Sequence, residues 1–150
     1  MTERSNTGDA GETAPPIGRI VETAIYVEDL QRAQTFYVGV LGARILLESG
    51  RLVALDLQRE SVLLLFQRGA TLTPLETPGG TVPPHGATGV QHLAFAIHSS
   101  DLEAWAAHLE RSGVAVESRV KWPRGGESLY LRDPEGHSVE LITPGLWATY

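Results

Sequence analysis

The chain has 150 residues and a mass of 16.2 kDa, enough for one domain that buries about 70% of the surface of its unfolded form. Its apolar fraction of 42% and charged fraction of 20% exclude a fully disordered, collagen-like or coiled-coil protein. The net charge of −6 argues against nucleic acid or anionic lipid as a partner. Because there is no cysteine, any metal must be held by His, Asp or Glu.

The termini and apolar runs predict a cytoplasmic protein with no membrane partner. The longest apolar run, Val62 to Phe66, is far too short to span a bilayer, and no apolar signal core follows Met1. Residues 1–16 are rich in small and polar residues and end in two prolines, which predicts a disordered tail.

The first structured unit covers residues 17–67. Its sequence pattern predicts a strand, a helix and three further strands. A β-branched run over 19–27 alternates as a strand does and places Glu22 on the face opposite its aliphatic residues. Asp29 is a suitable helix N-cap, and the helical spacing of apolar residues stops at Gly42. The three following strands are expected near 44–48, 51–57 and 61–67.

A Pro/Gly-rich linker loop over 68–89 separates this unit from a second one over 90–144 with the same pattern. A strand over 91–97 has His92 on the face opposite its large apolar residues, and residues 100–103 predict a capping box for the next helix. The chain is therefore interpreted as an internal duplication. Further strands are expected near 114–121, 127–132 and 137–143, before a C-terminal tail over 145–150.

The alternation of the strands brings several polar side chains to the face that points away from the helices. Glu22 and His92 occupy this face on the opening strands, and the closing hairpin places Tyr130 beside Glu140. An ionised Glu140 between aliphatic neighbours is costly to bury unless a cation or base compensates it. Glu22, His92 and Glu140 are residues of metal-ligand type whose placement on strands needs a reason.

At this point the chain resembles the vicinal oxygen chelate superfamily, which includes glyoxalase I, extradiol dioxygenases, fosfomycin-resistance enzymes and bleomycin-resistance proteins. The resemblance runs from about Ile17 to Pro144. Its most specific segments are Val27-Glu28-Asp29-Leu30 with Phe36-Tyr37-Val38-Gly39-Val40-Leu41-Gly42, then Gly89-Val90-Gln91-His92-Leu93-Ala94-Phe95, and Leu131-Arg132-Asp133-Pro134-Glu135-Gly136-His137-Ser138-Val139-Glu140-Leu141.

The resemblance implies an α+β fold in which two tandem β-α-β-β-β modules form a curved mixed sheet around a cup. It implies a divalent metal ion (Fe, Mn, Zn, Ni or Mg) held by Glu22, His92 and Glu140, with positions left for two substrate oxygens. A fourth ligand position falls on Leu63, which weakens the likeness to glyoxalase I. Some members complete each cup with a second chain, so a homodimer would bring Glu22 of one chain to the other two ligands.

Two functions from different classes follow. One is a metal-dependent dioxygenase or lyase/isomerase acting on a small-molecule substrate, with Glu22 or Glu140 as the base and Tyr130 as a hydrogen-bond donor. The other is a metal-free protein that sequesters a ligand, as bleomycin-resistance proteins do.

Each site residue also has a plainer role open to it. Glu22 can pair with Arg19 or Arg44, His92 can be a satisfied core histidine, and Tyr130 can simply fill space. His85 is either a surface residue or a base or ligand at the cup mouth. The 121–126 loop either covers that mouth or is a solvated hairpin loop, and Trp147 either covers the mouth or makes a dimer contact.

Overall fold

The computed structural model describes residues 14–150, which form two four-stranded sheets, two α-helices and a small hairpin. Most of the tail expected over 1–16 lies outside the described residues. Residues 14–16 are exposed and have no regular secondary structure. No helix within the described part of the chain is long and apolar enough to cross a membrane.

The first module has the predicted order of elements. β1 pairs in parallel with β4, and the strand order across the sheet is β1-β4-β3-β2. The predicted cap is confirmed, because the Asp29 carboxylate accepts a hydrogen bond from the Arg32 backbone N–H at 2.9 Å. The elements are β1 (Glu22–Val27), α1 (Leu30–Gly39), β2 (Arg44–Glu48), β3 (Leu52–Leu57) and β4 (Ser61–Gln67).

The second module repeats this topology, with β7 parallel to β10 and the strand order β7-β10-β9-β8. The predicted capping box is wrong, because the Ser100 hydroxyl donates to the Asp101 carboxylate and a 3₁₀ turn (Ser99–Asp101) precedes the helix. The first strand of the final three also starts later than expected. The elements are β7 (His92–Ala96), α2 (Leu102–Arg111), β8 (Ser118–Lys121), β9 (Glu127–Arg132) and β10 (Ser138–Ile142).

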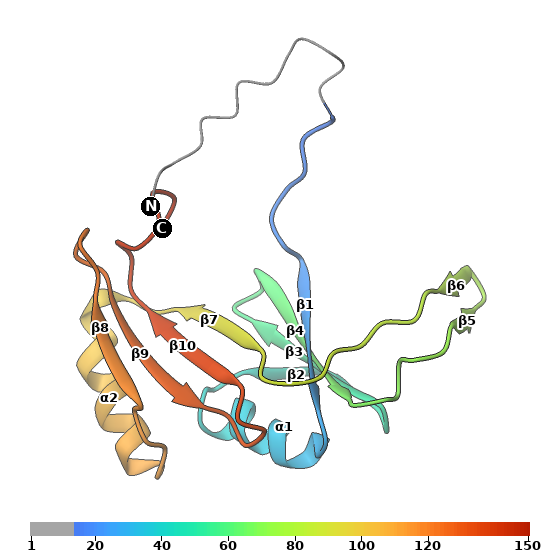
Figure 1. Cartoon of the computed structure of the whole chain (residues 1–150), viewed down its shortest axis with the longest axis horizontal. Coiled ribbons are helices and arrows are strands. Elements are labelled where there is room, and N and C mark those ends of the chain that lie inside the picture. The colour runs from blue at the N-terminus through green and yellow to red at the C-terminus, as the bar shows by residue number, and fades with distance from the viewer. Residues whose placement is uncertain (1–13) are drawn as a thin grey trace.

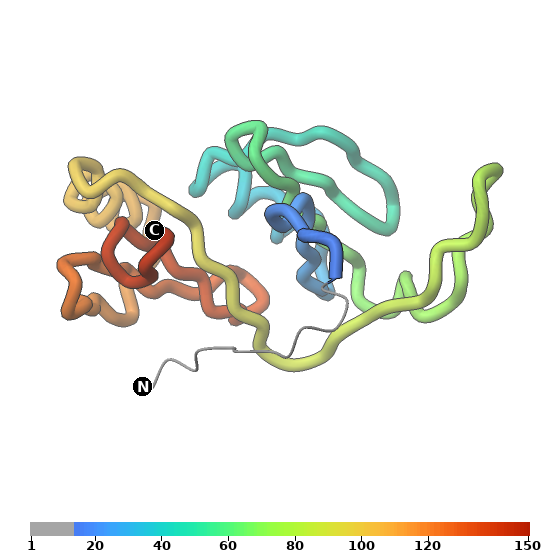
Figure 2. Tube along the Cα trace, turned by 90° about the horizontal axis from the view of Figure 1, so that it is seen from above, coloured from blue at the N-terminus to red at the C-terminus, as the bar shows by residue number. Residues whose placement is uncertain are grey.

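The two sheets stand side by side and share one hydrophobic core (Figures 1 and 2). Helix α1 lies below the boundary between them, where Tyr37 is fully buried and its hydroxyl donates to Asp133 of the second module at 2.8 Å. The inward face of each opening strand packs on this core, which leaves Glu22 and His92 on the outer faces. The α+β fold with two β-α-β-β-β modules is confirmed.

The segment predicted as a linker loop contains a short hairpin of its own, β5 (Leu75–Thr77) and β6 (Gly80–Val82). We call residues 68–89 the arm. It projects away from both sheets (Figures 1 and 2) and exposes apolar side chains. These are Leu72, Leu75 and Val82, with exposed fractions of 66%, 41% and 44%.

Candidate metal centre

His92 and Glu140 face each other on the outer surface of the second sheet. His92 opens β7, and Glu140 lies in the middle of β10, the strand next to it. The distance from His92 Nε2 to Glu140 Oε2 is 3.3 Å. The Glu140 side chain is 5% exposed and the His92 side chain 53%, so the pair joins a buried carboxylate to an imidazole that solvent or a ligand can reach.

The other polar atom of each side chain is already occupied. His92 Nδ1 lies 3.1 Å from the Ser138 carbonyl oxygen and 3.3 Å from the Ser138 hydroxyl. In the tautomer whose Nδ1 carries the ring proton, Nδ1 donates to the carbonyl and Nε2 is an electron-pair donor. Glu140 Oε1 accepts a hydrogen bond from the fully buried Ser128 hydroxyl at 2.5 Å. In that tautomer two electron-pair donors, Nε2 and Oε2, face each other at 3.3 Å and can share a cation. In the other tautomer the Nε2–H donates to Oε2.

This donor pair fits a divalent metal ion. Neutral imidazole nitrogen and carboxylate oxygen are ligands for Zn²⁺ and for other transition metals. Two neighbouring ligands bound at about 2.1 Å lie roughly 3.0–3.4 Å apart in octahedral or tetrahedral geometry, and the observed separation of 3.3 Å falls in that range. This separation is compatible with two adjacent ligands of one ion.

Tyr130 lies directly across the β9–β10 ladder from Glu140, as the alternation of the hairpin predicted. Its ring stacks on the His92 ring with a centroid distance of 6.3 Å. Burial, followed by the hydrogen bond and charge of Glu140, raises the pKa of Tyr130. A tyrosine hydroxyl is protonated at neutral pH in any case, and this shift keeps it protonated at more alkaline pH as well.

Glu22 does not join this pair within one chain. It is exposed at the start of β1, in the other sheet, and its register partner is Val62 of β4. Residues 14–150 contain no group of three His, Cys, Asp or Glu side chains that could hold a metal ion. The alternative ion pair with Arg44 is not formed either, because Arg44 pairs with Asp56 at 2.7 Å. The predicted third ligand stays a prediction that requires a second chain.

The fourth ligand position falls on Leu64, and its prediction at Leu63 is wrong. Glu140 lies opposite Ala94, two residues after His92, whereas Leu64 lies opposite Ala24, two residues after Glu22. Leu63 is fully buried in the core. A shift of one residue along a strand moves a side chain to the other face, so the error in alignment exchanged a core position for an outer one.

His85 is held on the outer face of the first sheet, at the base of the arm. Its Nδ1 lies 2.5 Å from the Tyr26 hydroxyl, and its ring meets Phe66 edge-on at 4.9 Å. Tyr26 is on the same face of β1 as Glu22, four residues further along. His85 therefore contributes to the surface next to Glu22, and its role as base or ligand remains a prediction.

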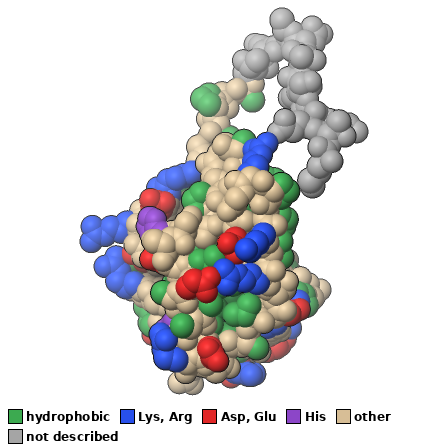
Figure 3. Space-filling view, turned by 90° about the vertical axis from the view of Figure 1, so that its left-hand side faces the viewer, with side chains coloured by type: hydrophobic (Ala, Val, Ile, Leu, Met, Phe, Trp, Pro, Cys, Tyr) green, Lys and Arg blue, Asp and Glu red, His purple; other side chains and the backbone are tan. Residues whose placement is uncertain are grey.

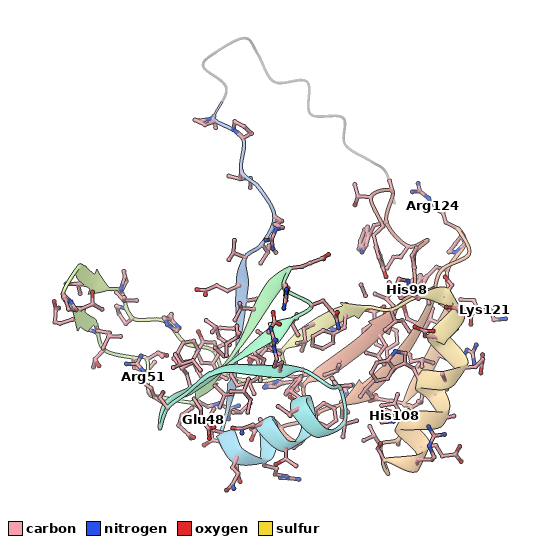
Figure 4. The ribbon with its side chains drawn as sticks, turned by 180° about the vertical axis from the view of Figure 1, so that it is seen from behind. Glu48, Arg51, His98, His108, Lys121 and Arg124 are labelled. Atoms are coloured by element: carbon pink, nitrogen blue, oxygen red, sulfur yellow. The ribbon has the colours of Figure 1, made fainter. Side chains whose placement is uncertain are left out.

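Two other histidines, to which the sequence assigned no role, join the modules. His137 is 1% exposed and lies 3.0 Å from the Gln91 backbone N–H and 2.9 Å from the Tyr26 carbonyl oxygen. His108 on α2 lies 2.8 Å from the Val40 carbonyl at the end of α1 (Figure 4). These contacts join residues far apart in the chain, so no local pattern could have revealed them.

The 121–126 loop contributes a partly buried contact and exposed charges. The Trp122 indole N–H donates to the Ser128 hydroxyl at 2.7 Å, whereas Lys121 and Arg124 point outward (Figure 4). On this side of the molecule, acidic and basic side chains are intermixed (Figure 3). Trp147 is 61% exposed. Ser128 and Trp122 belong to the site, and the signal available for Ser128 was the alternation that also placed Tyr130.

Comparison with known proteins agrees with this architecture. A model of the Glyoxalase/Bleomycin resistance protein/Dioxygenase superfamily matches residues 19–141. The chain belongs to this superfamily, and the resemblance identified from its motifs is confirmed.

Its relatives include enzymes with different reactions. The chain is 29% identical to metallothiol transferase FosB of Staphylococcus saprophyticus over 118 residues, or 78% of this chain and 71% of that protein. It is 28% identical to catechol-2,3-dioxygenase of Bacillus subtilis over 77% of this chain, but over only 38% of that longer protein. The crystal structure of lactoylglutathione lyase from Agrobacterium tumefaciens superposes with a TM-score of 0.81 and 34% identity, covering 89% of this chain and 99% of that one.

Proposed function

We propose that this protein is a divalent-metal-dependent enzyme of the dioxygenase or lyase/isomerase type, acting on a small substrate that binds through two oxygens. The observation that carries the proposal is the pair of ligand-type atoms, His92 Nε2 and Glu140 Oε2, facing each other at 3.3 Å. Three relatives, whose names describe a transferase, a dioxygenase and a lyase, support an enzyme. They leave the reaction open.

The residues have distinct tasks in this proposal. His92 and Glu140 hold the ion, and Glu22 of a second copy supplies the third ligand. An ion with three protein ligands keeps positions for substrate oxygens and supplies Lewis acidity to them. Tyr130 donates a hydrogen bond to a substrate oxygen, since it lies beside Glu140 and its hydroxyl is protonated at neutral pH. Glu22 or Glu140 is the candidate base.

A homodimer accounts for the features that the single chain leaves incomplete. Glu22 is exposed on the outer face of the first sheet, and the donor set of the second sheet needs another ligand. The first sheet also exposes apolar side chains at its two edges, which are β1 and β2. The exposed apolar side chains near β1 and on β2 are Ile20, Val21, Ile45, Leu46 and Leu47.

Metal content tests the proposal directly. Protein purified without chelator and incubated anaerobically with Fe²⁺ or Mn²⁺ is expected to hold about one ion per chain, measured by elemental analysis. The variants Glu140→Ala and His92→Ala are expected to hold little. Arg44→Ala, which removes an outer-face residue already paired with Asp56, serves as the control. No ion in the wild-type protein under any of these conditions would contradict the proposal.

The second candidate function is a metal-free binding protein. It is favoured by the same contact, because an Nε2–H of His92 that donates to Glu140 Oε2 satisfies both groups without a metal. The superfamily description includes bleomycin resistance proteins. This candidate predicts no metal in wild-type protein after the same incubations, measured by elemental analysis.

A further inference from the structure

We infer that Trp122 and Ser128 are positioning residues that lock the Glu140 carboxylate so that only Oε2 is presented to a ligand. The contact itself is a property of the chain alone, and its consequence for a metal rests on the proposed function. Three side chains form the relay: the Trp122 indole, the Ser128 hydroxyl and Glu140 Oε1.

The chemistry of the groups determines the direction of the relay. The indole N–H can only donate, so Ser128 Oγ accepts from Trp122 at 2.7 Å. A serine hydroxyl has one proton, and with its oxygen accepting from the indole that proton goes to Glu140 Oε1. The indole polarises the hydroxyl, which strengthens its hydrogen bond to the carboxylate. Glu140 is thereby held through its Oε1 atom.

Burial makes this arrangement difficult to replace by solvent. Ser128 is 0% exposed and Glu140 is 4% exposed, so a broken relay would leave polar groups unsatisfied away from water. Ser128 lies opposite Ile142 on the same hairpin that pairs Tyr130 with Glu140, so the strands themselves fix its distance from the carboxylate.

The position of Trp122 depends on the end of the chain. Residues 122–126 form a tight turn. It is closed by a hydrogen bond from the Gly125 N–H to the Trp122 carbonyl and another from the Trp122 N–H to the Gly126 carbonyl. Gly126 packs so closely on Gly145 that a Cβ at Gly126 would lie 2.9 Å from the Gly145 carbonyl carbon. The C-terminal segment therefore fixes the turn that carries the indole.

The consequence is a carboxylate that binds through one oxygen. With Oε1 occupied by Ser128, Oε2 is the atom that faces His92 at 3.3 Å. Hydrogen bonds that orient a metal ligand typically contribute about 10–100-fold to metal affinity. We therefore expect Ser128→Ala, which breaks the relay, to weaken metal binding by about 10–100-fold. Trp122→Phe is expected to cause a smaller loss in the same direction, because Ser128 keeps its hydroxyl.

The first test needs no metal. In NMR spectra of the metal-free protein, the indole proton of Trp122, identified by its absence in Trp122→Phe, is expected to exchange slowly with solvent. In Ser128→Ala its exchange rate and chemical shift should move toward those of Trp147, whose residue is 61% exposed. A Trp122 indole that already exchanges like Trp147 in the wild-type protein would overturn the relay whatever the protein binds.

The second test is a double-mutant cycle on Mn²⁺ affinity, measured by calorimetry. Trp105→Phe is the matched control, because Trp105 lies on α2, where its ring contacts that of His108. If the relay acts as a unit, Trp122→Phe has no further effect once Ser128→Ala is present. Unchanged Mn²⁺ affinity in Ser128→Ala, or losses of affinity that simply add in the double variant, would overturn the inference. The proposed function would stand in that case, because the wild-type protein binds the metal. Failure of the wild-type protein to bind Mn²⁺ or Fe²⁺ would instead defeat the proposed function.

Discussion

Leu64 and Glu140 occupy equivalent positions in the two modules, each on a closing strand and each opposite an alanine two residues after the first candidate ligand of its module. One module therefore supplies a carboxylate where the other supplies an aliphatic side chain. In the proposed dimer, the outer face of the first sheet adds Glu22 but no second ligand. The metal would keep more open positions than a site with four protein ligands.

Leu64→Glu is predicted to add a fourth ligand and to increase metal affinity at least tenfold, measured by competition with a chelator. Leu64 is half-buried on the outer face, so a carboxylate there stays close to solvent and to Glu22. Leu63→Glu is the matched control. Leu63 is 0% exposed, and a charge in the core costs several kcal/mol, so that variant should fail to fold. Equal behaviour of the two variants would show that the assignment of faces is wrong.

Mixing two defective variants is predicted to restore metal binding if the site spans two chains. Glu22→Ala leaves His92 and Glu140 intact, and Glu140→Ala leaves Glu22 intact. Random exchange of subunits makes about half of the dimers mixed, each with one complete site of two, so about a quarter of the wild-type metal should return. Mixing without recovery, although the subunits exchange by mass spectrometry, would refute the shared site.

His137→Ala is predicted to lower the free energy of unfolding by about 2–4 kcal/mol, because it leaves a cavity and two unsatisfied backbone groups. The imidazole is 1% exposed and joins the Gln91 N–H of one module to the Tyr26 carbonyl of the other. His98→Ala, at an exposed residue, should change stability by less than about 0.5 kcal/mol. Urea unfolding of both variants measures the difference, and similar midpoints would contradict the structural role of His137.

Stability at alkaline pH is predicted to depend on Tyr37. Burial, together with the charge and hydrogen bond of Asp133, raises the pKa of Tyr37. Below pH 10 this tyrosine is protonated in both states, but above pH 10 only the unfolded state ionises readily, so stability falls as pH rises.

Tyr37→Phe should therefore be less stable than the wild-type protein by about 1–3 kcal/mol at pH 7, because the hydrogen bond to Asp133 is lost. The difference should narrow by up to about 1.4 kcal/mol per pH unit above pH 10. Urea titrations at pH 7, 9 and 10.5 measure it. A gap that stays constant across this range would show that Tyr37 ionises equally in the folded and unfolded states.

Local patterns were sufficient for the order of elements in the two modules and for which residues share a strand face, but they missed the short hairpin in the arm. Alternation placed Glu140 beside Tyr130, and the cap at Asp29 was predicted from residue type, because both depend on neighbours within a few positions. Aligning the two modules by counting residues failed at Leu63. An error of one residue placed the fourth ligand position on the core face of β4, whereas the equivalent residue on the outer face is Leu64. The motifs also identified the superfamily, since its specific segments extend over most of the chain.

The sequence by itself thus determined the repeated module, the superfamily and the residue types that can hold a metal. Only the tertiary structure decided that His92 and Glu140 meet while Glu22 lies in another sheet, and that Trp122 and Ser128 secure the carboxylate. The physical reason is that periodicity assigns a side chain to a face of its own strand. Distances between strands far apart in the chain depend on how the two sheets pack around their shared core.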